Sequence, residues 1–147
     1  MKHPLHLQLL LISLLLSALT SCDIHMSDNG DLDGFWQLAR IDTLQGGSAD
    51  VRSARLFWSV QSDLLQVSDL TYRHDAYILR FDYQGSTLRL SSPYLVDHAG
   101  SDVALTDSQP LHPYGIQHLD ETFTIECLDA DKLSLQSSLL RLEFNRY

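Results

Sequence analysis

Apolar and polar residues alternate along most of the chain from residue 34 onward. A period of two places successive side chains on opposite faces of a strand. The pattern therefore predicts eight strands, at about 35–42, 55–61, 64–72, 76–84, 87–92, 121–128, 132–137 and 139–147. Short links such as Gly85-Ser86 favour antiparallel neighbours. A ninth strand is expected if residues 94–96 or 115–119 also pair.

One long stretch, residues 93–119, lacks this alternation and contains Pro110 and Pro113. A segment of this length with weak structure is typical of a functional lid or of a disordered excursion. No segment after residue 33 has the 3.6-residue period of an amphipathic helix. Many short, evenly spaced strands predict an all-β sandwich or barrel.

The N-terminus has a different pattern. Residues 7–19 are apolar except for Gln8, Ser13 and Ser17, and Lys2 precedes them. As a helix this run rises about 20 Å, which is short of the roughly 30 Å hydrocarbon core of a bilayer. A charged start, a short apolar run and a small-residue exit predict a secretory signal rather than a transmembrane span.

The exit from this run, Leu19-Thr20-Ser21-Cys22, resembles the lipobox of bacterial lipoproteins. The resemblance implies that the Cys22 thiol receives a diacylglycerol and that the chain is cut before it. Three segments follow: a signal peptide at 1–21, a lipidated cysteine with a flexible acidic tether at 22–33, and a barrel domain at 34–147. The alternative is an ordinary secretory signal with a chance cysteine.

The net charge of the chain limits the classes of partner that it can bind. The 147-residue chain has 10 basic and 19 acidic residues, and removal of segment 1–21 takes away one lysine and no acid, which leaves a net charge of −10. Such an acidic domain is a poor partner for nucleic acid. We expect membrane attachment by acyl chains, in the cell envelope and at its outer membrane. Asp23 resembles an inner-membrane retention signal, whereas Asp28, Asp31 and Asp33 resemble surface-export signals. The sequence therefore does not decide between the periplasmic and the surface face of the membrane.

The tripeptide Gly34-Phe35-Trp36 resembles the Gly-x-Trp that begins the first strand of lipocalins. The stretches "LDGFWQLARIDT", "ARLFWSVQSDLLQV", "LHPYGI" and "DKLSLQSSLLRLEFNRY" resemble the uncharacterised lipocalin-like lipoproteins of Bacteroidales-type bacteria. This resemblance implies an antiparallel, eight- to nine-stranded up-and-down barrel. It also implies that Trp36 closes one end beneath an arginine of the last strand, either Arg141 or Arg146. The helix that lipocalins place before the last strand has no room here.

Seven aromatic residues fall at inward positions of the predicted strands. They are Trp36, Trp58, Tyr77, Phe81, Tyr83, Phe123 and Phe144. An eight-stranded barrel either just fills with side chains or holds one small ligand. The set is therefore either plain core or the lining of a cavity for an apolar guest, oriented by tyrosine hydroxyls.

Metal chemistry has little support in the sequence. Asn29, Asp31 and Asp33 imitate the start of a calcium loop, but its twelfth position is Arg40 instead of glutamate. His112 and His118 flank a Pro-Tyr-Gly-Ile segment, and a metal site there needs a third ligand from Asp97 or His98. We expect no metal site and no cofactor.

Catalytic chemistry has no better support. There is no Gly-x-Ser-x-Gly, and Ser101-Asp102 after His98 is a chance polar cluster. Asp120 and Glu121 are expected on opposite faces of a strand, which suits a carboxylate pair poorly. Cys127 is expected to be a small buried hydrophobe, on the face of Phe123.

These observations give two hypotheses, neither of them enzymatic. The first is a lipid-anchored envelope barrel that binds a small apolar or amphipathic molecule, with residues 93–119 near its mouth. The second is a filled barrel that serves as an interaction or accessory module of an envelope complex. An interior void of about 300 Å³ or more would favour the first hypothesis.

Overall fold

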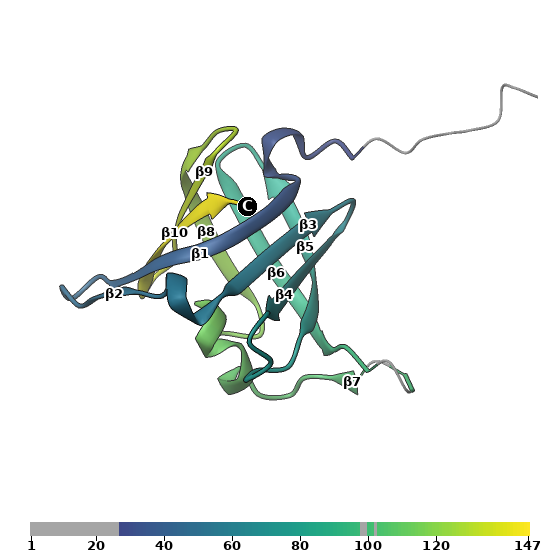
Figure 1. Ribbon diagram of the computed structural model, residues 1–147. Helices are drawn as coiled ribbons and strands as arrows, with labels where there is room; N and C mark the ends of the chain where they lie inside the picture. The colour runs from purple at the N-terminus through teal and green to yellow at the C-terminus, as the bar shows by residue number, and fades with distance from the viewer. Residues whose placement is uncertain (1–26, 98–99, 102) are drawn as a thin grey trace, which may run out of the picture.

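Eight antiparallel strands close into one barrel in the computed structural model, which describes residues 27–97, 100–101 and 103–147 (Figure 1). They are β1 (Gly34–Thr43), β3 (Leu56–Gln61), β4 (Leu64–Asp69), β5 (Tyr77–Gln84), β6 (Thr87–Leu95), β8 (Glu121–Leu128), β9 (Lys132–Gln136) and β10 (Leu140–Arg146). Each strand pairs with the next in this order, and β10 pairs with β1 to close the barrel. The predicted all-β, up-and-down barrel is confirmed.

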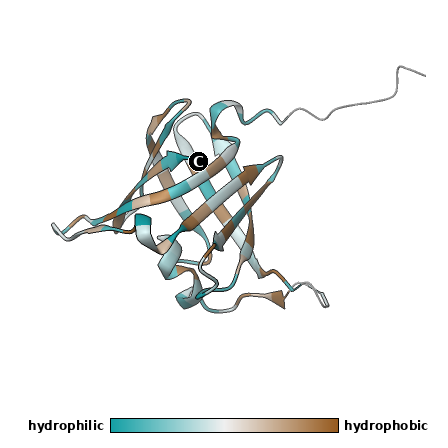
Figure 2. Ribbon diagram, in the orientation of Figure 1, coloured by the Kyte–Doolittle hydropathy of each residue, from teal (hydrophilic) through white to brown (hydrophobic). Residues whose placement is uncertain are grey.

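The strands form where the sequence alternates. In β10, Leu140, Leu142 and Phe144 are buried, whereas Arg141 is exposed. Brown and teal segments alternate along the strands for the same reason (Figure 2). Residues 94–95 extend β6 instead of adding a ninth barrel strand, and residues 115–119 form no strand. Two short strands escaped the sequence pattern: β2 (Ser48–Asp50) beside β1 and β7 (Val103–Ala104) beside β6.

A β-bulge reverses one expected orientation. The register of β8 against β9 shifts between Ile125 and Cys127, so two residues of β8 are spanned by one step of β9. The extra residue turns the Cys127 side chain outward, where it is exposed. The prediction of a buried Cys127 is wrong, because strict alternation does not survive a bulge.

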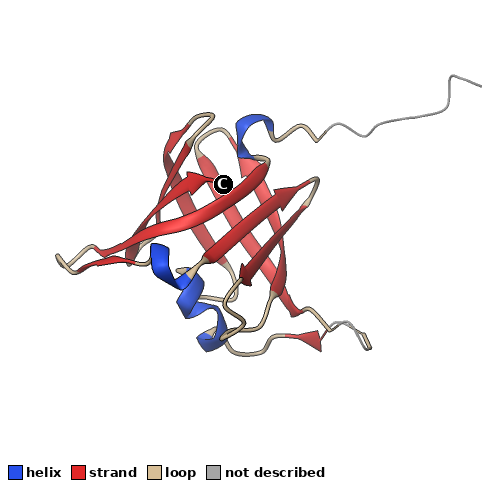
Figure 3. Cartoon of the chain, in the orientation of Figure 1, coloured by secondary structure: helices blue, strands red, loops and turns tan. Residues whose placement is uncertain are grey.

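The described part of the chain has three short 3-10 helices, which do not belong to the strands of the barrel wall (Figure 3). They are η2 (Gly30–Leu32), η3 (Arg52–Ala54) and η4 (Gln109–Tyr114). η2 lies at the end of the barrel where the described chain begins, and η4 lies at the opposite end (Figure 1). Leu32 is fully buried, so the packed domain begins before the expected boundary at residue 34, and this part of the expected tether is ordered. No helix among the described residues is long and apolar enough to cross a bilayer.

The main core lies inside the barrel and contains 21 buried residues. A second, smaller aromatic cluster lies on the outer face, where the Phe35 and Phe57 rings stack with centroids 4.5 Å apart. The C-terminal Tyr147 ring packs edge-on against both, and Phe57 is fully buried as a result. This cluster fixes the end of the chain against β1 and β3.

Candidate ligand-binding site

The seven aromatic residues expected to line a cavity all contribute to the core. Trp36, Trp58, Tyr77, Phe123 and Phe144 are buried, whereas Phe81 and Tyr83 are partly buried and pack against them. The Trp58 ring lies 4.9 Å from the Phe144 ring and 5.9 Å from the Phe123 ring, measured between centroids. The structure therefore packs the Trp58 ring against the Phe144 and Phe123 rings inside the barrel core.

One end of the barrel is closed by Trp36 and Arg146. The Arg146 guanidinium lies 4.3 Å from the centre of the Trp36 ring, and the indole N–H donates to the Leu32 carbonyl oxygen at 2.9 Å. The guanidinium also donates to the carbonyl oxygens of Asp31 and Asp33. Of the two arginines expected as partners, Arg146 occupies this position, and Arg141 forms an ion pair with Glu126 at 2.8 Å.

Gly34 makes this closure possible. Its φ of +144° lies in a region that favours glycine, and a Cβ at this position would lie 2.3 Å from Arg146 Nη1. The glycine of the Gly-x-Trp motif thus leaves room for the arginine that covers the tryptophan.

The opposite end is closed by a plug, which we define as residues 109–118. Leu111, Tyr114 and Ile116 of the plug are fully buried and belong to the barrel core. The Trp58 indole N–H donates to the Tyr114 carbonyl oxygen at 3.1 Å, and the Tyr114 hydroxyl donates to the Asp75 carbonyl oxygen at 2.7 Å. The sequence allowed either a functional lid or a disordered excursion for residues 93–119. The plug, which is part of this stretch, reaches into the barrel mouth.

Gly115 ends η4 and sets the close approach of the plug to the wall. Its φ is +84°, and a Cβ there would lie 2.6 Å from a methyl carbon of Leu142. Burial raises the pKa of the neighbouring Tyr114 hydroxyl, with a smaller contribution in the same direction from the Asp69 charge.

Asp69 organises the turn beside the plug. Its side chain is 1% exposed, and it accepts hydrogen bonds from the backbone N–H groups of Thr71, Arg73 and His74. The Thr71 hydroxyl donates at 2.6 Å, and His74 Nδ1 lies 2.8 Å from Asp69 Oδ2. Burial raises the pKa of this carboxyl, but the hydrogen bonds outweigh burial and lower the pKa from 3.8 to about 2.

The adjacent carboxyls Asp120 and Glu121 point to opposite faces, as the strand pattern predicted. Asp120 is exposed and pairs with Arg89 at 2.5 Å on the outer face. Glu121 is 4% exposed and shares the inward face with Phe123. Sequence reasoning did not assign Glu121 to the site, although its position two residues before Phe123 indicated the inward orientation.

Two hollows in the described part of the molecule are open to the surface. One of about 390 Å³ lies beside η2 and has Tyr83, Ile125 and Leu128 on its wall, with Asp28 and Asp31 among its polar residues. Of the predicted lining residues, Tyr83 lies on the wall of this hollow. This hollow has the volume of a small-ligand site, but it lies outside the packed rings.

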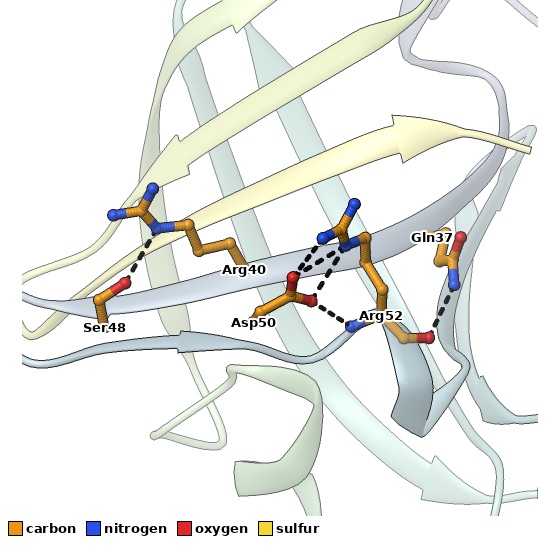
Figure 4. Close-up of polar contacts among 5 residues, drawn as sticks. All are labelled: Gln37, Arg40, Ser48, Asp50 and Arg52. Carbon is orange, nitrogen blue, oxygen red and sulfur yellow. Dashed lines mark hydrogen bonds and ion pairs between the residues drawn. The ribbon is translucent and has the colours of Figure 1, made fainter.

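A second hollow, of about 450 Å³, lies where the β1–β2 arm projects from the barrel. Figure 4 shows Arg52 of η3 holding Asp50 through both its side chain and its backbone N–H. Arg40 of β1 donates to the Ser48 hydroxyl at 3.0 Å, and Gln37 donates to the Arg52 carbonyl oxygen at 3.0 Å. These contacts pair the local charges with one another and fasten β2 and η3 to β1.

The remaining sequence candidates do not assemble into a site. Among the described residues, no group of three or more His, Cys, Asp or Glu side chains is arranged to hold a metal ion. Asn29 donates to Asp33 at 2.8 Å, within the turn around η2. Cys22, His98 and Asp102 lie outside the described residues, as does the expected signal segment 1–21.

Comparison with known proteins places the fold in a family. A lipocalin-like protein from Bacteroides uniformis, solved at 1.79 Å, is 21% identical and superposes with a TM-score of 0.61, over 80% of this chain and 100% of that one. An uncharacterized protein from Bacteroides eggerthii is 14% identical, with a TM-score of 0.58, over 78% and 98% of the two chains. No curated protein matches the chain. The sequence profile described as "Lipocalin-like domain" matches residues 15–147, so this chain belongs to the lipocalin-like domain family.

Proposed function

We propose that this protein is a lipid-anchored envelope lipoprotein whose barrel binds a small apolar or amphipathic molecule. The observation that carries the proposal is the plug. The two ends of the barrel are closed differently: Trp36 and Arg146, both on barrel strands, close one end, and a separate 3-10 segment closes the other. A guest can enter at the second end without any loss of strand pairing.

The energetics allow the plug to move. Burying Leu111, Tyr114 and Ile116, all fully buried, contributes about 5–9 kcal/mol in total. Ordering the six residues 111–116, which span these three side chains, costs about 6–12 kcal/mol of backbone entropy. Because the two quantities are of similar size, an apolar guest that takes the place of the plug side chains can offset the cost of opening.

The proposed anchor gives the barrel an orientation. The described chain begins at Ser27, at the η2 end, five residues after Cys22. A lipid on Cys22 would hold the end closed by Trp36 toward the membrane and leave the plug facing away from it. The substitution Cys22→Ser is expected to move the protein from the membrane fraction to the soluble fraction. Retention of the variant in the membrane would contradict the lipoprotein proposal.

Native mass spectrometry of the full chain, gently extracted from its own envelope, tests the binding proposal. We expect a reproducible added mass that denaturation releases. A bare protein mass in repeated preparations would overturn interior binding and favour the second candidate function.

The second candidate is a filled barrel that acts as an interaction module of an envelope complex. The packed rings favour it, and so do three apolar side chains on the outer face of β4–β6. Leu64 and Tyr94 are 39% and 38% exposed, and they line a hollow of about 290 Å³ with Ile78. A photo-crosslinker at position 94 should then capture a specific envelope protein, and one at Leu44, on the exposed β1–β2 turn, should not.

A further inference from the structure

Glu121 is a buried carboxylate with no obvious structural need for both of its oxygens. It is the first residue of β8 and is 4% exposed. Its partner across the ladder is Leu90 of β6, which is fully buried, and the next inward residue of β8 is Phe123. Acidic side chains are almost never this buried unless they are paired. The position therefore calls for a polar partner inside an apolar barrel.

The two oxygens of Glu121 differ in their contacts. Oε2 accepts hydrogen bonds from the backbone N–H groups of Gln117 and His118, at 2.5 and 3.2 Å. Oε1 is buried and accepts no hydrogen bond from any residue that the structure describes. Leaving a buried charged acceptor without a donor costs several kcal/mol. Oε1 is thus an acceptor without a donor at the junction of plug and barrel wall.

No neighbouring cation in the described structure compensates this carboxylate. Arg89, which precedes Leu90 on β6, binds Asp120 on the outer face through two contacts at 2.9 and 2.5 Å. His118 contributes its backbone N–H, and the residue is exposed. The interior around Glu121 therefore carries an acidic group and lacks a basic one among the residues described.

We infer that Glu121 anchors the head group of the guest, and that this head group is a primary amine on an aliphatic chain. The inference rests on the proposed function. An ammonium group donates three hydrogen bonds and compensates the buried charge, so it can satisfy Oε1 and replace the two plug N–H groups at Oε2. A fatty acid would bring a second carboxylate to the same place and is excluded. The plug and the guest then compete for one carboxylate.

Three six-carbon probes test this inference on the full-length protein held in lipid nanodiscs: hexylamine, 1-hexanol and hexanoate. Saturation-transfer NMR titrations, with empty nanodiscs subtracted, give the three dissociation constants. We expect hexylamine to bind at least about tenfold more tightly than hexanoate. This selectivity is measured on the unchanged protein and needs no variant.

Two matched variants test whether the preference for hexylamine depends on Glu121. Glu121→Gln keeps the shape of the side chain and is expected to weaken hexylamine about tenfold, while 1-hexanol changes less than about threefold. Asp120→Asn alters the adjacent outward carboxylate and should leave all three probes unchanged. A thermal melt of each variant checks that it folds, and if Glu121→Gln does not fold, the probe selectivity of the unchanged protein decides.

The possible outcomes distinguish a failure of this inference from a failure of the proposed function. Equal binding of hexylamine and hexanoate, or unchanged hexylamine binding by folded Glu121→Gln, would refute the anchor and leave apolar binding intact. Failure of all three probes to bind the unchanged protein would overturn the proposed function and the anchor with it.

Discussion

Trp36→Ala is the sharpest test of how this barrel is closed. Trp36 is fully buried, its indole N–H donates to the Leu32 carbonyl oxygen, and its ring lies 4.3 Å beneath the Arg146 guanidinium. Truncation to alanine removes all three interactions at once. It also leaves a large cavity at the end of the barrel that has no plug.

The expected loss follows from these contacts. Replacing a buried tryptophan by alanine costs about 3–5 kcal/mol through lost burial and the cavity. The unpaired Leu32 carbonyl and the lost cation–π contact bring the total to about 4–6 kcal/mol. For a domain of this size, that loss lowers the melting midpoint by about 15–25 °C. Trp36→Phe keeps most of the apolar burial and loses the N–H donor, so we expect a loss of about 1–2 kcal/mol.

Urea denaturation followed by far-UV circular dichroism measures these differences in the free energy of unfolding. Leu44→Ala is the control, because Leu44 is 51% exposed on the β1–β2 turn and its loss should stay within about 0.5 kcal/mol. A double-mutant cycle with Arg146→Ala should give a coupling energy above about 0.5 kcal/mol. A Trp36→Ala loss no larger than that of the control would refute the closing role, and additive variants would refute the direct Arg146 contact.

Three further predictions follow from the geometry. The folded-state pKa of Asp69 is about 2, below its ordinary 3.8. Its ionised carboxylate therefore adds about 2 kcal/mol to the free energy of unfolding above pH 4, and this contribution is lost as pH falls toward 2. Asp69→Asn should flatten this part of the stability–pH curve, and a curve of unchanged shape would contradict the prediction. Gly115→Ala places a methyl 2.6 Å from Leu142 at a φ of +84°, so hydrogen exchange in residues 109–118 should rise, and unchanged protection would refute this packing. Cys127 is exposed, so N-ethylmaleimide should label it in the native protein as fast as in urea, as peptide mass mapping can show, whereas protection until unfolding would restore the buried interpretation.

The sequence by itself determined the strands and the position of one end of the barrel. Alternation of apolar and polar residues is a local property, because a strand faces core and solvent in turn whatever its neighbours are. All eight barrel strands therefore form close to where the pattern predicts them. Gly34-Phe35-Trp36 also marked the end that Trp36 closes, since the glycine and the tryptophan act within a single strand.

Tertiary structure decided everything that depends on register between distant segments. Arg146 rather than Arg141 covers Trp36 because β10 pairs with β1 in one particular register, with Trp36 opposite Arg146. A bulge against β9 turned Cys127 outward, although its own strand predicted the opposite. Pairing geometry of this kind is set by partners far along the chain, and a period of two carries no information about it.

The plug shows that sequence-based prediction of the candidate site is limited in the same way. Residues 93–119 have no period, so the sequence placed them near the barrel mouth but did not indicate that Leu111, Tyr114 and Ile116 fill it. Their burial depends on Trp58, Asp75 and Leu142, which come from other strands and loops. The role proposed for Glu121 also depends on tertiary structure. Only the folded plug shows which of its oxygens accepts a hydrogen bond and which is without a donor. Local patterning thus fixed the wall of this barrel, and long-range contacts decided what fills it.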